Sequence, residues 1–183
     1  MTVTFPGMPS PAAGFDEPFE MLAGCHERVQ RTLDLLDRLV AHLQQHGSDA
    51  AAQSAARDVL RYFDIAAPQH HLDEERHLVP LLQASGDTRL QAAAERLLAD
   101  HRLIEQSWAA LRPLLQALQD GAATQGAALD ALATEAQHFI DLHGPHILLE
   151  DGLAFPQARL HITPEQAAAM SADMAARRGV HRA

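Results

Sequence analysis

The segment FDIAAPQHHLDEERHLVP at residues 63–80 has a second version, FIDLHGPHILLEDGLAFP, at residues 139–156. The two versions align without a gap at an offset of 76. In both of them apolar residues recur at steps of three and four, which predicts an amphipathic helix. The alignment pairs His70 with His146, Glu74 with Glu150, and Pro80 with Pro156. Each version therefore predicts a helix that carries the motif His-x-x-x-Glu.

A shorter repeat precedes each of these helices. Residues 22–26, LAGCH, match residues 97–101, LLADH, at an offset of 75, so that His26 corresponds to His101. Each half of the chain then contains one helix with a single histidine and a second helix with His-x-x-x-Glu. We interpret each half as one helical hairpin.

Apolar periodicity in the rest of the chain completes four long amphipathic helices. Their expected bounds are Asp16 to about His46, residues 49–82 with a bend at Pro68, the segment between the turn at 85–87 and Gly121, and about residues 123–155. The sequence TPEQ at residues 163–166 has the form of an N-cap, a first-turn proline and a capping-box glutamine. It predicts a short additional helix that ends near Arg177.

This pattern predicts an all-α fold. Short turns force consecutive helices to alternate direction, so we expect an up-down-up-down antiparallel four-helix bundle with a short extra C-terminal helix. We divide the chain into a flexible N-terminal leader at residues 1–15, the bundle at residues 16–160, and the C-terminal helix and tail at residues 161–183.

Composition excludes several classes of function. The 183 residues include 14 basic and 24 acidic ones, and the resulting charge of -10 repels phosphate backbones and anionic lipid. No apolar run approaches the roughly 20 residues that span a bilayer, and the N-terminus lacks the basic and apolar regions of a signal peptide. The single Cys25 excludes a disulfide framework and a cysteine-based zinc site. We therefore expect a cytoplasmic protein without a nucleic-acid or membrane partner.

The chain has an unusually large number of histidines, 12 in all, and the core-facing positions of the helices select six candidate metal ligands. These candidates are His26, His70, Glu74, His101, His146 and Glu150. His71 and Glu75 also have the His-x-x-x-Glu spacing, but they lie about 100° round the helix from the core-facing positions and have no counterpart in the second half. We therefore expect His71 to be solvated. His143 is expected to line the site without binding metal.

Six such residues in an apolar core require partners. Burying unpaired carboxylates and imidazoles costs several kcal/mol per ion. Divalent cations remove this cost, and a hydrogen-bonded polar core is the other solution. A mixture of imidazole and carboxylate ligands suits Fe, Zn, Mn or Cu rather than Ca or Mg.

At these residues the chain resembles the hemerythrin / HHE cation-binding family. The resemblance covers roughly residues 17–158 and rests on His26, His70-x-x-x-Glu74, His101 and His146-x-x-x-Glu150. It implies two iron ions joined by an oxo or hydroxo bridge. It also implies that the two glutamates are bridging ligands and that the four histidines are terminal ligands.

One position departs from the family pattern. Oxygen-carrying hemerythrins place a further histidine one turn after the histidine of the third helix, and here that position is Glu105. Because residues four apart share a helix face, we expect Glu105 to be a ligand or to lie close to the metals.

The resemblance leaves three classes of function open. The chain is expected to be a non-haem di-iron protein that binds or senses O2, NO or peroxide. Alternatively, it is a di-iron oxidoreductase that reduces peroxide or NO, or an iron storage or delivery protein. The sequence does not distinguish a monomer from a homo-oligomer.

Overall fold

A computed structural model describes residues 17–180 of the chain, and the regular elements in this part are all helices. This confirms the predicted all-helical class. The elements are α1 (Pro18–His46), α2 (Ala50–Arg61), η1 (Tyr62–Ala66), α3 (Ala67–Asp73), η2 (Glu74–Leu78), α4 (Val79–Ala84), α5 (Thr88–Gln119), α6 (Ala127–Leu149), η3 (Glu150–Ala154), α7 (Phe155–His161) and α8 (Pro164–Arg177). The predicted leader at residues 1–15 and the N-cap Asp16 lie outside the described residues.

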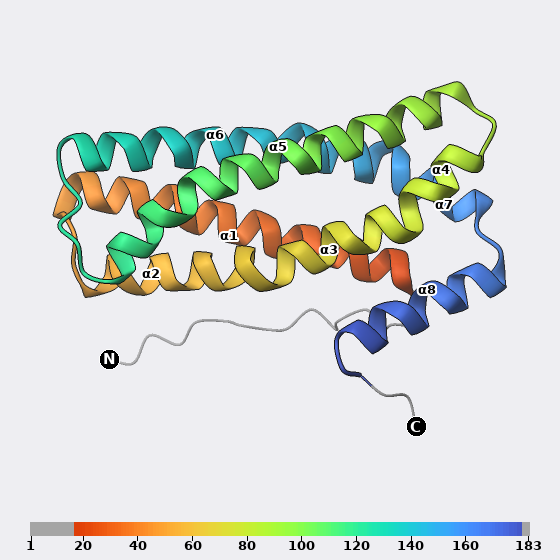
Figure 1. Cartoon of the computed structure of the whole chain (residues 1–183), viewed down its shortest axis with the longest axis horizontal. Helices are drawn as coiled ribbons and strands as arrows, with labels where there is room; N and C mark the ends of the chain where they lie inside the picture. The colour runs from red at the N-terminus through yellow and green to blue at the C-terminus, as the bar shows by residue number, and fades with distance from the viewer. Residues whose placement is uncertain (1–16, 181–183) are drawn as a thin grey trace, which may run out of the picture.

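The elements join into four long helical runs and the short α8. The second run extends from α2 to α4 and the fourth from α6 to α7, while α1 and α5 each form a run alone. Each run returns along the previous one after a turn (Figure 1). Helix α1 contacts α2 and α6, and α5 contacts the same two helices from the other side. The four runs therefore enclose one interior.

Three wide helical turns, η1, η2 and η3, interrupt the second and fourth runs. In each of them a backbone N–H binds the carbonyl five residues earlier, as from Val79 to Glu74 and from Phe155 to Glu150. Each wide turn ends two residues before a proline, namely Pro68, Pro80 or Pro156. A proline ring lacks an N–H and clashes with the carbonyl four residues back, and a widened turn relieves that clash. Each wide turn thus coincides with a proline, although Pro113 and Pro145 lie inside α5 and α6 without a wide turn.

The apolar interior consists of two clusters. The larger one includes Leu36, Leu115 and Phe139, and the other includes Leu22, Leu90 and Met170. On α1 the second cluster ends at Leu22 and the first begins at Val29, with the buried His26 between them. The bundle therefore has a polar layer between two apolar clusters.

The connections agree with the sequence except around the fourth run, which begins later than expected and continues to His161 rather than ending near Phe155. Helix α1 ends before Gly47, and Thr163 and Gln166 form the predicted capping box of α8. Helix α6 begins at Ala127 rather than near residue 123. Its start is displaced because Gly121 and Gly126 both adopt positive φ, at 89° and 55°, which a helix cannot continue through.

Helix α8 lies against the bundle close to the polar layer. Arg177 and Arg178 both donate to the carboxylate of Asp73, which is fully buried on α3. Asp173 of α8 accepts a hydrogen bond from His77. These contacts fix α8 beside the run that carries His70 and Glu74. No helix within residues 17–180 is both long enough and apolar enough to span a membrane.

We predict that Leu115→Ala lowers the free energy of unfolding by about 2–5 kcal/mol, because it leaves a cavity in the larger apolar cluster. Leu115 is fully buried, whereas Leu103 on the same helix is 47% exposed. The matched substitution Leu103→Ala should change stability by less than about 0.5 kcal/mol. Urea unfolding followed by circular dichroism measures both values, and equal losses would contradict the assigned core.

Candidate metal centre

The polar layer contains all six residues that the repeat selected. Each is buried, and they come from all four helical runs. Their positions are His26 on α1, His70 on α3, Glu74 at the start of η2, His101 on α5, His146 on α6 and Glu150 at the start of η3. Both glutamates therefore occupy the first position of a wide turn.

Four of these residues form a first group, site A, defined as His26, His70, Glu74 and Glu150. Their ligand atoms all lie within 4.8 Å of one another. The Nε2 atom of His70 is 3.1 Å from Oε1 of Glu74, and Nε2 of His26 is 3.1 Å from Oε2 of Glu150. These separations allow the four side chains to bind one cation between them.

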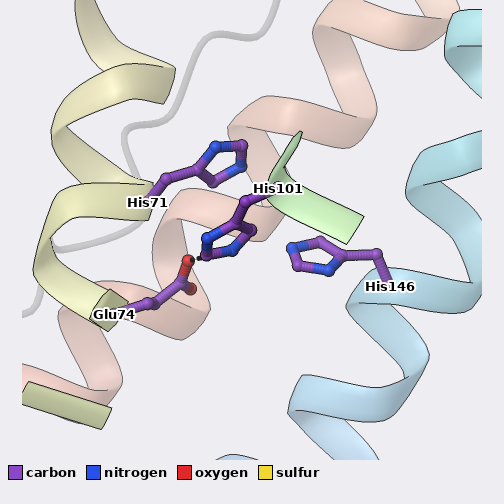
Figure 2. A group of neighbouring side chains, drawn as sticks. All are labelled: His71, Glu74, His101 and His146. Atoms are coloured by element: carbon purple, nitrogen blue, oxygen red, sulfur yellow. Dashed lines mark ion pairs between the residues drawn. The ribbon is translucent and has the colours of Figure 1, made fainter. Parts of the chain in front are cut away.

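A second group, site B, is defined as His71, Glu74, His101 and His146, and its ligand atoms also lie within 4.8 Å of one another (Figure 2). Nε2 of His101 is 3.4 Å from Oε2 of Glu74. Glu150 reaches this side as well, since its Oε1 is 3.4 Å from Nε2 of His146.

Each glutamate thus offers one oxygen to each site. Oε1 of Glu74 faces site A and its Oε2 faces site B. Oε2 of Glu150 faces site A and its Oε1 faces site B. Two carboxylates placed in this way can bridge a pair of cations.

Seven of the buried ligand atoms have no hydrogen-bond partner among residues 17–180. These unpartnered atoms are both oxygens of Glu74, both oxygens of Glu150, and Nε2 of His26, His101 and His146. A buried polar atom without a partner costs about 1–3 kcal/mol, and more when it is charged. So many unpartnered atoms directed at one space fit bound cations and do not fit a hydrogen-bonded polar core.

The pKa values of the two glutamates move in opposite directions. Burial and the neighbouring Glu150 carboxylate raise the pKa of Glu74 well above its ordinary value. Burial also acts to raise the pKa of Glu150, but His26, His146 and His70 together lower it to about 2. Glu74 therefore favours the protonated form and Glu150 the ionised form.

A lowered pKa favours the neutral imidazole, which is the form that binds metals. Burial lowers the pKa of His70 to about 3 and also lowers the pKa of His146. The pKa of His26 is raised instead. Burial lowers it, but the nearby charges of Glu150 and Asp151 and the hydrogen bond to Asp151 outweigh this effect.

Comparisons with known proteins agree with this site. The model of the hemerythrin HHE cation-binding domain matches residues 17–158. The chain is also similar to an uncharacterized protein of Haemophilus influenzae, with 33% identity over 173 residues, which cover 94% of this chain and 96% of that protein. The chain belongs to the hemerythrin HHE cation-binding domain family. The matched residues include every member of sites A and B.

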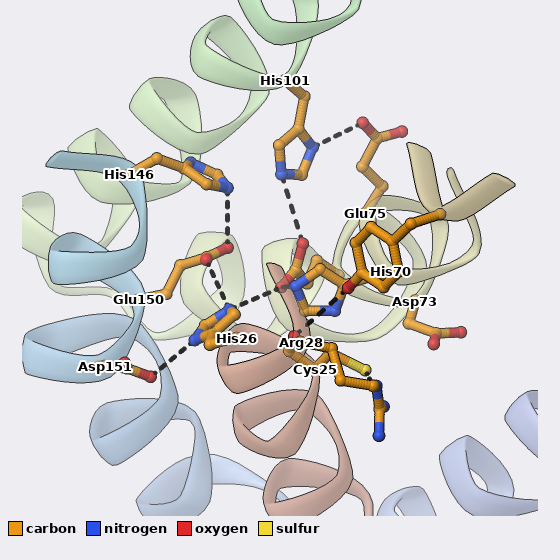
Figure 3. Close-up of polar contacts among 12 residues, drawn as sticks. Cys25, His26, Arg28, His70, Asp73, Glu75, His101, His146, Glu150 and Asp151 are labelled. Carbon is orange, nitrogen blue, oxygen red and sulfur yellow. Dashed lines mark hydrogen bonds and ion pairs between the residues drawn. The ribbon is translucent and has the colours of Figure 1, made fainter. Parts of the chain in front are cut away.

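Two outer carboxylates orient histidines of this hemerythrin domain (Figure 3). Nδ1 of His26 donates to Oδ1 of Asp151 at 2.9 Å, and Nδ1 of His101 donates to Oε1 of Glu75 at 2.9 Å. Each bond leaves Nε2 directed at the bridging glutamates and increases the basicity of the imidazole. The repeat pairs Glu75 with Asp151, but their bonds to histidines of other helical runs were not predicted.

His71 lies in site B, so the expectation of a solvated side chain is wrong. The residue is partly buried, and its ring stacks on that of His101 with 4.1 Å between centroids and an angle of 10° between planes. Burial and then His101 hold the pKa of His71 well below its ordinary value. The sequence did contain a sign of this position, because His71 lies three residues before Glu74. Residues three apart share a helix face, as residues four apart do.

Glu105 belongs to neither site, and its side chain is exposed on α5. The buried positions of that helix continue from His101 to Ile104, three residues later, and then to Ser107 and Leu111. From Leu97 to Leu118 the buried positions advance by about 3.5 residues on average, as in a helix that follows its neighbours in a bundle. A residue four positions after His101 therefore turns toward solvent.

His143 is buried next to the metal sites but is not a member of either. Its Nδ1 donates to the carbonyl oxygen of Phe139 at 2.8 Å, and its ring contacts the rings of Phe63 and Phe139. Burial lowers its pKa to about 4. This position agrees with the expectation that His143 lines the site.

We predict that Asp151→Asn and Glu75→Gln each weaken metal binding roughly 10–100-fold, because an amide supports the imidazole less strongly than a carboxylate. Competition with a chromophoric chelator measures the affinity. Asp141→Asn is the matched control, since Asp141 is exposed and bonds only to Gln137 among the described residues. Variants indistinguishable from this control would contradict the role of the outer carboxylates.

Proposed function

We propose that this protein is an up-down-up-down four-helix bundle that holds two iron ions and binds or senses O2, NO or peroxide. His26 and His70 bind the iron at site A, His101 and His146 bind the iron at site B, and the two glutamates bridge them. The proposal rests on the placement of the two glutamates, each of which directs one oxygen toward site A and the other toward site B.

The donor set favours iron over zinc, calcium and magnesium. A structural zinc ion needs four ligands in a closed tetrahedron and has no use for a bridged pair. Ca and Mg prefer oxygen ligands, whereas histidine supplies most of the donors here. When bound, a pair of iron ions supplies reversible electron transfer and sites for small exogenous ligands.

The surroundings of the sites favour small ligands. The ring of His26 stacks on Phe155 with 5.2 Å between centroids, and Phe63 and Phe139 enclose His143. The two apolar clusters border the polar layer along the bundle. A centre enclosed by packed side chains suits molecules the size of O2, NO and hydrogen peroxide.

We predict two iron ions per chain after expression in iron-replete medium. His70→Ala and His146→Ala should each reduce the iron content, because each removes one terminal ligand. Elemental analysis measures the stoichiometry. The control is His138→Ala on the exposed face of α6, which should retain both ions. One zinc ion per chain, or no metal, would exclude the proposed centre.

Anaerobic optical titration of the reduced iron protein tests the proposed ligands. We expect a reversible spectral change with O2 or NO, because an enclosed centre limits irreversible oxidation. Catalytic turnover of peroxide or NO would instead favour an oxidoreductase. Iron uptake beyond two ions per chain, without any response to these molecules, would favour storage or delivery.

A further inference from the structure

Helix α8 supplies the positive charges for a buried carboxylate that adjoins the metal centre. The side chain of Asp73 is fully buried, and the residue directly precedes Glu74, whose oxygens face sites A and B. Among residues 17–180, Asp73 forms ion pairs with Arg177 and Arg178 alone. A buried charge that loses its partner is strongly destabilising. The ionised form of Asp73 therefore depends on the docked position of α8.

Asp73 and Glu74 are consecutive, but their side chains serve different sides of the helical run. In Figure 3 the carboxylate of Asp73 points away from His101 and Glu150. The two residues occupy the junction at which α3 ends and the wide turn η2 begins, so that one side chain faces α8 and the other faces the metal sites. A movement of α8 that displaces Asp73 must therefore shift the backbone that carries Glu74.

Two further polar contacts fasten α8 to the same helical run. Oδ2 of Asp173 lies 2.8 Å from Nε2 of His77 and 2.9 Å from Nη2 of Arg177. Nη1 of Arg177 donates to Oε1 of Gln69 at 3.4 Å. Gln69 precedes Glu74 along the run and His77 follows it. The contacts of α8 therefore hold the run on both sides of the bridging glutamate.

The apolar face of α8 connects this run to helix α1. Met170 and Met174 of α8 are buried in the smaller apolar cluster together with Leu22 of α1. Helix α8 lies along this side of the bundle in Figure 1 and contacts α1 there. Since α1 carries His26 and α3 carries His70, α8 joins the two helices that supply both histidines of site A.

We propose that α8 is a clamp that holds site A in its metal-binding arrangement. Arg177 and Arg178 are its positioning residues, and they act on Glu74 through Asp73. The clamp lies outside the segment that matches the family's domain model, because that match ends at residue 158 and α8 begins at Pro164. Docking of α8 and binding of iron then favour each other. The inference rests on the proposed function, because it requires bound iron.

Hydrogen exchange of the backbone amides, followed by mass spectrometry, tests this coupling in the wild-type protein. If docked α8 strengthens iron binding, bound iron must stabilise the docked helix by the same factor. We expect exchange in α8 to slow by about 5–150-fold when the metal-free protein takes up ferrous ions in the absence of oxygen. Helix α2 is the internal control for general stabilisation of the bundle. A change in α8 no larger than that in α2 would overturn the clamp.

Substitutions separate the clamp from a general loss of stability. The triple variant Asp73→Asn/Arg177→Gln/Arg178→Gln removes the ion pairs without leaving a buried charge. We expect it to bind ferrous ions about 5–150-fold more weakly, as measured by competition with a chromophoric chelator. Arg177→Lys/Arg178→Lys retains the positive charges and should bind iron more tightly than the triple variant. Arg112→Gln breaks an exposed ion pair with Asp64 and is the control, which should retain wild-type affinity.

Circular dichroism establishes that each metal-free variant is folded before iron is added. A folded triple variant with wild-type affinity for iron would overturn the clamp and leave the proposed function intact. If the triple variant does not fold, the exchange measurement on the wild type decides. Fewer than two iron ions in the wild type would overturn the proposed function, and this inference with it.

Discussion

Two glutamates share a buried layer between apolar clusters, and the rest of the site depends on how their charge is compensated. Glu74 and Glu150 are both fully buried, and neighbouring carboxylates in such a place cannot both ionise without nearby positive charge. Their opposite pKa shifts express this conflict in the protein alone. In the proposed function two cations would resolve it, since each carboxylate oxygen would then face a positive charge. Metal binding would also be coupled to folding, because the ions would bind the folded chain and not the unfolded one.

The backbone places these charges through its departures from the regular α-helix. Glu74 and Glu150 each begin a wide turn that ends two residues before a proline. The wide turn accommodates the proline ring and begins at the residue that bridges the two sites. Wide turns of this kind occur frequently at functional sites in helices. The repeated proline is therefore a structural part of the metal centre, although its side chain contacts no metal. Asp73, one residue before Glu74, ties this run to α8 through Arg177 and Arg178.

The sequence predicted the helices and the six repeated residues because both depend on periodicity, which sequence displays directly. Whether those six are ligands stays a prediction. The errors arose where small changes of helix phase matter. Glu105 was included because four residues make approximately one turn, but the buried positions of α5 advance by about 3.5. His71 was excluded on the phase of an ideal helix, although a spacing of three from Glu74 was sufficient. Glu75 and Asp151 were missed because a hydrogen bond between different runs leaves no trace in the periodicity of either one.

The repeat also explains how the side chains beside the two sites can differ while the helices that carry them remain equivalent. The repeat makes the pair His26 and His70 equivalent to the pair His101 and His146, and it makes Asp151 equivalent to Glu75. Such equivalence alone would produce two equal metals, and an exogenous ligand would have no preferred side. The two halves differ at two positions close to the motif. One residue after the histidine of the motif, His71 is aligned with Ile147. Three residues before that histidine, Ala67 is aligned with His143. Both lie on the helices that carry the bridging glutamates. A substitution there changes the number of imidazoles or the polarity beside one site, while the bridging carboxylates and the bundle remain unchanged.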